Sequence, residues 1–380
     1  MNPTPLTELL DRHVRSGLLP GAVAAVASGD DLEVAVVGAR GLDGPPMTRD
    51  TIFRIASVGK PITAAATMVL VDEGLLGLDD PVARWLPELA SPVVVRTPES
   101  PVDHVVPARR AITVRDLLTF LGGHGFPADF SLPAVRMLVN VLRKGARAPE
   151  DVPAPDEWMR ILATVPLLHH PGDSWLYNTG SDVLGVLVAR VAGRPFAEFL
   201  AEQIFVPLGM RDTGFHVPAS DLDRFTTAYR PDGSRLAVTD PPDGQWSTAP
   251  AFCSGSGGLV STLDDLLAFQ RMLLAGGGEV LSPEAVALMT TDHLTAAQRA
   301  ASTLFLDGQG WGFGGSVDVE RTDPWNVPGR YGWIGGSGTA AHIDPVGHGI
   351  TVLLTAVALE SPAAPAVMRD FWAHTAQVRS

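Results

Sequence analysis

Cysteine is nearly absent from this 380-residue sequence, and Cys253 is the only one. A lone cysteine excludes an internal disulfide framework and a zinc site made of Cys-x-x-Cys pairs. The ten histidines include no His-Glu-x-x-His pair, and we expect His169 and His170, just before Pro171, to order a turn. The glycine-rich run 308–315 lacks Gly-x-Gly-x-x-Gly spacing and a following helix, which argues against a dinucleotide site. We therefore expect no metal ion and no cofactor.

Positive charge is also scarce. Lysine and arginine together number 28 against 42 acidic residues, and the net charge of −14 argues against nucleic acid and anionic membrane surfaces as partners. Residues 1–11 lack the basic and apolar regions of a signal peptide, and no later apolar stretch is long enough to span a bilayer. We therefore expect a cytoplasmic protein that acts on a small molecule and has no nucleic-acid or membrane partner. The sequence does not indicate its oligomeric state.

Lysine is the rarest charged residue, with only Lys60 and Lys144. Lys60 follows Ser57 by three residues, so a helix that begins at Ser57 would place the amine one turn from the hydroxyl, where it can accept the proton. Arginine, the basic residue that this sequence otherwise uses, stays protonated at any working pH and cannot be such a base. Serine and lysine also occur at this spacing by chance, so the pair needs support from its surroundings.

The residues after this pair predict a buried helix. Residues 61–71 are almost wholly apolar, and an acidic pair followed by glycine at 72–74 is typical of a helix end. Pro61 is tolerated only in the first turn of a helix, which fixes the helix start close to Ser57. Ser57 would then lie at the positive end of a core helix, where free N–H groups favour developing negative charge.

Two further segments have features of a catalytic site. Tyr177 is one of three tyrosines and lies in a turn before a helix that we expect from Ser181. The glycine-rich segment 331–339 would be an edge strand that a substrate acyl group can approach closely, with a glycine N–H aimed at the carbonyl. The simpler alternatives are a tyrosine that packs beside Trp175 with its hydroxyl satisfied by the backbone, and a flexible hairpin.

The periodicity of the sequence changes twice. Residues 21–27 and 32–37 predict two strands of a hairpin. From about residue 76 to 250 the pattern is helical and rich in proline, and strands return after it. The expected helices are 114–120, 155–164, 181–191, 196–205, 261–274 and 364–378, and the expected later strands are 310–317, 338–343 and 349–359.

The domain organisation follows from this order. With 46% apolar and 18% charged residues, the chain has enough apolar side chains for a large core. We expect residues 1–75 and 251–380 to form one α/β sheet domain, and residues 76–250 to form an inserted, mainly helical domain. The catalytic cleft would lie at their junction.

Three motifs in this order, Ser57-x-x-Lys60, Tyr177 and Trp333-x-Gly335-Gly336, resemble those of the serine β-lactamase and penicillin-binding-protein superfamily. The resemblance covers roughly residues 15 to 360. It is strongest to the branch that holds class C β-lactamases and the family VIII carboxylesterases, in which a Trp-Gly-Gly variant of the third motif occurs. It implies an α/β (α+β) fold with an antiparallel sheet flanked by helices and an inserted helical lobe.

The resemblance implies acyl transfer in two steps through an acyl-enzyme. Ser57 would attack the carbonyl while neutral Lys60, helped by Tyr177, takes its proton, and Tyr177 would protonate the leaving group and later activate water. The pKa of Lys60 must then fall from about 10.4 by roughly three units, which costs about 4 kcal/mol and requires burial. The residues expected to hold the oxyanion or bind substrate are Ser57, Gly336, Gly335, Trp333 and Asn178.

Two departures from the β-lactamase pattern favour an esterase. The second motif usually reads Tyr-x-Asn, whereas Asn178 directly follows Tyr177, so the amide that would grip a substrate is displaced. The third motif usually begins with lysine, whereas Trp333 stands here and removes a cation suited to the carboxylate of β-lactams. Arg330 is near enough in sequence to replace that cation. We therefore expect a serine hydrolase that acts as a carboxylesterase on small esters.

Other functions are also compatible with these motifs. A β-lactamase or D-amino-acid peptidase would cleave an amide with the same catalytic residues. A transacylase would pass the acyl group to an alcohol or amine, and a non-catalytic acyl-binding sensor would acylate without turnover. An α/β-hydrolase is not expected, because the sequence has no Gly-x-Ser-x-Gly.

Overall fold

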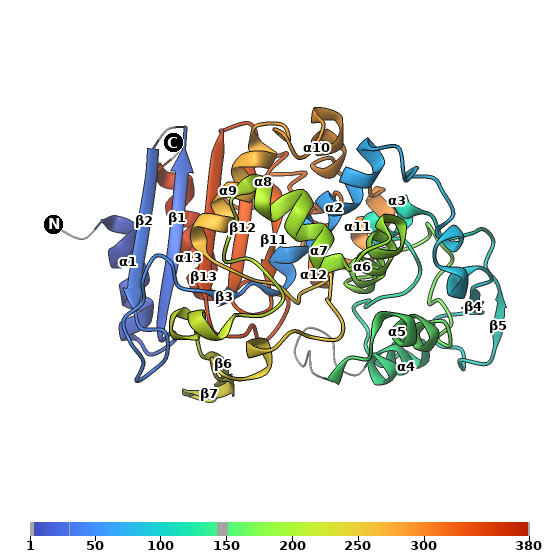
Figure 1. Cartoon of the computed structure of the whole chain (residues 1–380), viewed down its shortest axis with the longest axis horizontal. Coiled ribbons are helices and arrows are strands. Elements are labelled where there is room, and N and C mark those ends of the chain that lie inside the picture. Colours follow the sequence, from blue (N-terminus) through green and yellow to red (C-terminus); the bar gives the residue numbers. More distant parts are fainter. Residues whose placement is uncertain (1–3, 30, 143–150, 379–380) are drawn as a thin grey trace.

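The structure is a computed structural model that describes residues 4–29, 31–142 and 151–378, and it is built around a seven-stranded antiparallel sheet (Figure 1). The strand order β2-β1-β13-β12-β11-β10-β9 places the first and last parts of the chain side by side. The predicted fold class is confirmed. The strands are β1 (Gly21–Ser28), β2 (Asp31–Gly38), β9 (Gly310–Trp311), β10 (Ser316–Val317), β11 (Tyr331–Gly335), β12 (Thr339–Asp344) and β13 (Gly349–Thr355).

The predicted N-terminal hairpin is confirmed. β1 and β2 pair antiparallel from Gly21 opposite Gly38 to Ser28 opposite Asp31, and β1 pairs on its other side with β13. Every residue of β1 except the last is buried. A strand that is covered on both faces has no need of alternating polar residues, which explains its continuous apolar sequence.

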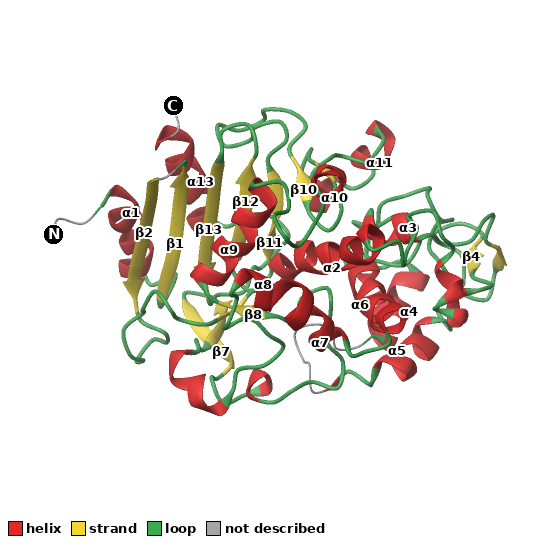
Figure 2. Ribbon diagram, turned by 45° about the horizontal axis from the view of Figure 1, so that its top comes forward, coloured by secondary structure: helices red, strands yellow, loops and turns green. Residues whose placement is uncertain are grey.

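Helices cover both faces of the sheet (Figure 2). On one face, α1 (Pro5–Arg15) and α13 (Ala366–Val378) pack together around the fully buried Phe371. On the other face, α2 (Lys60–Asp72) and α9 (Leu263–Leu274) belong to the larger of two cores. Alternate residues of β1 point into each core, as the period of a strand requires.

The middle of the chain is mainly helical, and the helices predicted there are confirmed with small shifts at their ends. The predicted helix 114–120 ends at Leu118, and the one expected from Ser181 begins at Thr179. The division into two domains at residues 75 and 250 stays a prediction. The elements are β4 (Val93–Val95), β5 (Val105–Pro107), α3 (Val114–Leu118), α4 (Pro133–Val141), α5 (Pro155–Leu162), α6 (Thr179–Ala192), α7 (Phe196–Leu200), a π-helical turn (Ala201–Phe205), α8 (Val206–Leu208), β6 (Ala228–Asp232) and β7 (Arg235–Asp240).

Shorter elements connect this part to the sheet. A two-stranded sheet joins Phe53–Arg54, which lie shortly before α2, to Val260–Ser261, which lie just before α9. Within the described part of the chain, no helix combines the length and apolar character that a membrane crossing needs. The cytoplasmic location stays a prediction. These elements are β3 (Phe53–Arg54), β8 (Val260–Ser261), α10 (Pro283–Met289), α11 (Ala296–Ala300) and α12 (Thr303–Leu306).

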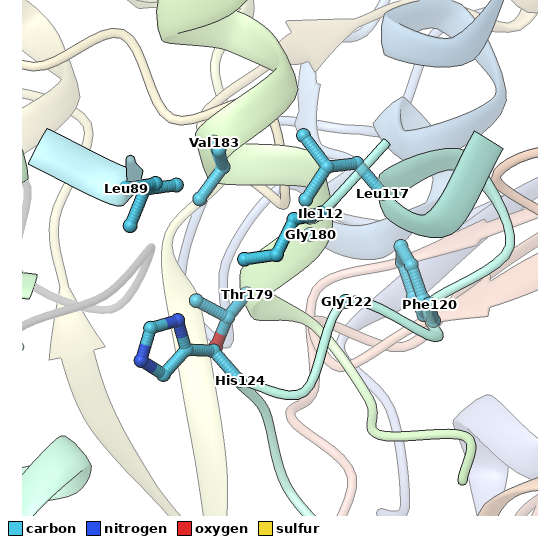
Figure 3. Close-up of a pocket in the computed structure, with 9 residues that line it drawn as sticks. All are labelled: Leu89, Ile112, Leu117, Phe120, Gly122, His124, Thr179, Gly180 and Val183. Carbon is cyan, nitrogen blue, oxygen red and sulfur yellow. The ribbon is translucent and has the colours of Figure 1, made fainter. Parts of the chain in front are cut away.

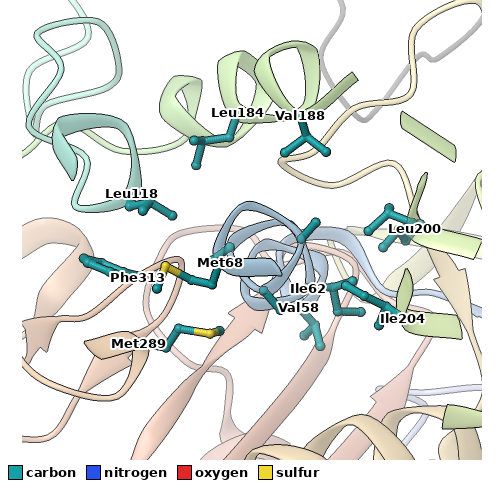
Figure 4. Packing of buried hydrophobic residues seen from close by; sticks show 14 of the residues in the cluster. Val58, Ile62, Met68, Leu118, Leu184, Val188, Leu200, Ile204, Met289 and Phe313 are labelled. Atoms are coloured by element: carbon teal, nitrogen blue, oxygen red, sulfur yellow. The ribbon is translucent and has the colours of Figure 1, made fainter. Parts of the chain in front are cut away.

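Helix α2 is the buried helix that the sequence predicted after Ser57. A 3₁₀ turn over Ala56–Gly59 leads into it, and it ends at Asp72 with Gly74 following at φ +71°. Eleven of its thirteen residues are buried. Figure 4 shows Met68 of α2 beside Phe313, with Leu184 of α6 on the helix across this core. The helix therefore holds its first turn rigidly between the sheet and the helical part of the chain.

One strand prediction is wrong. Residues 310–317 form the two short strands β9 and β10, which pair with each other, and not one continuous strand. The cause is the turn between them, where Gly314 has φ +74° and Gly312 lies so close to the neighbouring helix end that a Cβ would be 2.0 Å from Met289 O. Such a turn needs glycine.

Candidate active site

Ser57 lies in the turn that opens α2, and the backbone before it is strained. Ala56 has φ +44°, a left-handed conformation that costs a non-glycine residue roughly 1 to 3 kcal/mol. Thr339 Oγ1 donates a hydrogen bond of 2.9 Å to Ile55 O, so the start of β12 holds this backbone in place. The Ser57 side chain is partly exposed. The strain and the tether together keep a reactive hydroxyl at the positive end of a buried helix.

Lys60 is fully buried and lies against Ser57. Its Nζ is 2.8 Å from Ser57 Oγ and donates a hydrogen bond of 2.5 Å to Ser256 O. Burial lowers the pKa of Lys60 to about 7, and the nearby Asp182 opposes this shift. Near neutral pH a large fraction of the amine is therefore uncharged. Because one N–H is directed to Ser256 O, the lone pair is free to accept the proton of Ser57.

Tyr177 completes this group. Its Oη accepts a hydrogen bond of 2.7 Å from Trp333 Nε1, and its side chain also hydrogen-bonds to Ser57. Lys60 Nζ lies 4.8 Å from the centre of its ring. Burial raises the pKa of Tyr177 to about 12, although the bonds to Ser57 and Trp333 oppose this shift. The phenol is thus neutral at pH 7 and suited to relay a proton, while Lys60 titrates near this pH and is suited to act as a base.

The third predicted segment, residues 331–339, includes β11 and lies next to Tyr177. This strand is not an edge strand along its whole length, because β10 pairs with Tyr331 and Gly332, but β10 does not extend to residues 333–335. Gly336, just past the strand, is exposed and has open space where a side chain would be. Its N–H as an oxyanion donor stays a prediction.

The structure shows how Gly335 and Asn178 are packed, and it does not test whether they bind substrate. A Cβ on Gly335 would lie 2.4 Å from Ile55 O and 2.1 Å from Thr339 Oγ1, so this glycine lets β11 approach the turn before Ser57. Asn178 has φ +83° at the start of α6 and is partly exposed. A role of either residue in binding substrate stays a prediction.

Sequence reasoning missed an acidic group behind Lys60. Asp182 on α6 is buried and accepts hydrogen bonds from Ser254 Oγ (2.7 Å), Ser256 Oγ (2.9 Å) and Ser256 N (3.1 Å). Ser256 in turn offers its carbonyl to Lys60. Burial raises the pKa of Asp182, and the hydrogen bonds oppose that shift. The available signal was a single acidic residue in the first turn of the helix that follows Tyr177.

Arg330 does not take the place of the missing lysine. Its side chain is only 5% exposed, forms an ion pair with Asp318 at 3.5 Å, and lies over the ring of Trp372 with its guanidinium carbon 5.3 Å from the ring centre. Trp372 belongs to α13, on the face of the sheet opposite α2. The guanidinium is therefore held away from Ser57, and the expectation that it could bind a substrate carboxylate is not met.

A small cavity lies next to the start of α6 (Figure 3). His124 and Thr179 are among the residues that line it, whereas Ser57, Lys60 and Tyr177 are not. His124 Nε2 lies 2.8 Å from Val165 O, and burial lowers the pKa of this histidine to about 4. Among the described residues, no three His, Cys, Asp or Glu side chains converge in a way that could hold a metal ion.

Comparisons with known proteins identify the family of this chain. The profile of the family described as Beta-lactamase matches residues 6–376. Protein Rv1367c of Mycobacterium tuberculosis is 43% identical over 90% of this chain and 86% of its own length. Esterase EstB of Burkholderia gladioli is 33% identical over 81% of this chain and 78% of its own length. The solved structure of EstCE1, a hydrolase with promiscuous acyltransferase activity, superposes with a TM-score of 0.82 at 25% identity, covering 98% of this chain and 97% of that one.

Proposed function

This chain belongs to the beta-lactamase family, and from that premise we propose that it is a carboxylesterase that hydrolyses small uncharged esters through an acyl-enzyme on Ser57. The observation that carries the proposal is the contact of 2.8 Å between Lys60 Nζ and Ser57 Oγ, made by an amine whose pKa is lowered to about 7. A buried lysine poised to lose its proton, next to a serine at a helix start, is the arrangement that nucleophilic catalysis needs.

Acylation would use each of the three side chains. Ser57 Oγ attacks the ester carbonyl carbon while its proton moves to Lys60 Nζ, directly or through the Tyr177 hydroxyl. The carbonyl oxygen becomes negatively charged, and we propose that the N–H groups of Ser57 and Gly336 hold it. When the bond to the alkoxide breaks, Tyr177 Oη gives its proton to the departing oxygen and regains one from Lys60. The alcohol leaves, and the acyl group stays on Ser57.

Deacylation would run the same proton transfers with water. A water molecule takes the place of the departed alcohol, and its proton passes by way of Tyr177 to neutral Lys60 as the oxygen attacks the acyl carbon. Ser57 Oγ then leaves with a proton from Lys60, and the carboxylic acid is released. Because the phenol has a pKa near 12, its role is to relay the proton while Lys60 stores it.

Two observations favour esters over β-lactams and peptides. Trp333 occupies the position at which β-lactamases carry lysine, and Arg330 is held on the opposite side of the sheet. A cation for a substrate carboxylate is therefore missing from both candidate positions. The name of the Burkholderia gladioli relative, an esterase, points the same way. A transacylase is the second candidate, which the promiscuous acyltransferase activity of EstCE1 supports.

The test combines labelling with turnover. Wild type, Ser57→Ala and the control Ser220→Ala, an exposed serine at the start of a 3₁₀ turn, are treated with a fluorophosphonate and analysed by intact mass. The same proteins are assayed with p-nitrophenyl butyrate and with a chromogenic cephalosporin. We expect one adduct and ester turnover in wild type and Ser220→Ala, and neither in Ser57→Ala.

Each other outcome points to a different function. No adduct on wild type would overturn Ser57 as the nucleophile. An adduct without ester turnover would favour the sensor, or a transacylase if added alcohols restore turnover. Faster hydrolysis of the cephalosporin than of the ester would favour a β-lactamase.

A further inference from the structure

A row of aromatic side chains leads from Tyr177 toward the surface. Phe305 of α12 stacks on Tyr177, with ring centres 4.6 Å apart and planes at 26°. The ring of Phe130 lies 6.4 Å beyond Phe305, and Phe126 stacks on Phe130 at 5.5 Å. We call Phe126, Phe130 and Phe305 the aromatic platform. Its members come from two segments far apart in the sequence, which meet at the contact between Phe130 and Phe305.

The aromatic platform rests on a rigid base. The ring of Phe305 lies 6.0 Å from that of Trp175, which is 1% exposed and in ring contact with the fully buried Trp311. On the other side, Phe126 N donates to Tyr177 O at 2.9 Å and Tyr177 N donates to Phe126 O at 3.0 Å. Because these neighbours hold the Phe305 ring and the backbone of Phe126, a ligand that stacks on the aromatic platform loses little affinity to ordering them.

The outer end of the aromatic platform is open to solvent. Phe130 is 45% exposed, and among the described residues it is the only aromatic side chain in the set of exposed large apolar residues. Phe126 and Phe305 are partly exposed. Single exposed apolar residues are common on protein surfaces, but three touching aromatic rings that continue a catalytic site form a surface suited to an apolar ligand.

Because the aromatic platform lies against Tyr177, the proposed role of Tyr177 indicates which part of a substrate the platform contacts. If Tyr177 gives its proton to the departing alkoxide, the alcohol oxygen lies at Tyr177 Oη and its carbon substituents extend beside the Tyr177 ring, where Phe305 is stacked. The carbonyl oxygen points the other way, toward Ser57 and Gly336. We propose, resting on the esterase function above, that the aromatic platform binds an uncharged aromatic alcohol moiety of the ester.

The experiment compares esters that share one acyl group. The value of kcat/KM is measured by butyrate release for 2-naphthylmethyl butyrate and for ethyl butyrate, and their ratio is the selectivity. It is determined for wild type, Phe130→Ala, Phe305→Leu and the control Val139→Ala, an exposed apolar residue on α4 outside the aromatic platform. Phe305→Leu keeps an apolar side chain at this position and removes only the aromatic ring.

We expect the selectivity to fall about tenfold in Phe305→Leu, or about 1.4 kcal/mol. A smaller fall is expected in Phe130→Ala and none in Val139→Ala. An equal selectivity in all four proteins, with ester turnover intact, would overturn the aromatic platform and leave the esterase standing. Ethyl 2-naphthylacetate carries the ring on the acyl side. If its kcat/KM relative to ethyl butyrate falls in Phe305→Leu while that of the naphthylmethyl ester does not, the assignment to the alcohol is wrong.

A binding measurement separates the aromatic platform from the esterase function. The Kd of 2-naphthalenemethanol is measured by calorimetry on the same four proteins. If wild type hydrolyses no ester but Kd rises about tenfold in Phe305→Leu and stays constant in Val139→Ala, the aromatic platform stands and the esterase function fails. If the alcohol does not bind, or binds equally to all four proteins, the aromatic platform is refuted whether or not esters are hydrolysed.

Discussion

Trp333 Nε1 donates a hydrogen bond of 2.7 Å to Tyr177 Oη. The indole N–H is a donor only and carries no charge, so it stabilises negative charge on the phenol oxygen without supplying a cation to the site. This bond opposes the rise in the pKa of Tyr177 that burial causes. In the mechanism proposed above, Trp333 therefore has two effects, because it supplies no cation for a substrate carboxylate and supports the phenol that would relay the proton.

Trp333→Phe should lower kcat/KM for a small ester by about tenfold, because it removes a hydrogen bond worth about 1 kcal/mol or slightly more to the relay group. The control is Trp311→Phe. Trp311 is buried in the same aromatic cluster, and among the described residues its Nε1 has no hydrogen-bond partner. If both variants lose the same activity, the effect comes from packing and the hydrogen bond has no catalytic role.

Lys60→Met should abolish turnover and raise stability at neutral pH. Burial lowers the pKa of Lys60 from 10.5 to about 7, so between these pH values the unfolded chain binds a proton that the folded chain has lost. The free energy of unfolding of the wild type therefore rises with pH across this window, by about 4 kcal/mol from this group. Methionine removes that contribution. Urea unfolding of both proteins from pH 7 to 10 tests this, and a parallel rise in the variant would contradict it.

The residues that the sequence could identify are those whose neighbours are local or rare. Ser57 and Lys60 are one helical turn apart, and Tyr177 stands out because tyrosine is scarce. Asp182 could not be found in this way, because its partners Ser254 and Ser256 lie 72 and 74 residues further along the chain. Only tertiary packing brings these groups together.

The two wrong expectations have different causes. The turn within 310–317 depends on the approach of Met289 O to Gly312, which sequence periodicity does not report. Arg330 is three residues before Trp333, but its side chain takes part in a buried ion pair on the far side of the sheet, with Asp318. Side chains three positions apart along a strand point to opposite faces, so the alternation that continues into β11 indicates that Arg330 and Trp333 lie on different sides, and closeness in sequence was the wrong criterion.

The pH dependence of turnover should follow the titration of Lys60. Since only the neutral amine accepts the proton of Ser57, kcat/KM should rise with pH through about 7. The charge of Asp182 raises the pKa of Lys60, so Asp182→Asn should move this rise to lower pH by about one unit. Ser254→Ala, which removes a hydrogen bond to Asp182 but keeps its carboxyl group, is the control and should shift the rise less. An unchanged profile in Asp182→Asn would show that this residue does not tune the base.

Two adjacent glycines should differ sharply in their tolerance of a methyl group. In Gly335→Ala the new Cβ would lie 2.1 Å from Thr339 Oγ1 and 2.4 Å from Ile55 O, the two atoms whose hydrogen bond fixes the backbone before Ser57. Displacing the nucleophile by about 1 Å costs on the order of 100-fold in rate, so kcat should fall by about that factor. Gly336→Ala places its Cβ in open space and keeps the N–H, so the loss should stay within about fivefold. Steady-state kinetics of both variants with one ester test this difference in kcat. Equal losses would mean that the substrate needs the open space at residue 336 as well as its N–H.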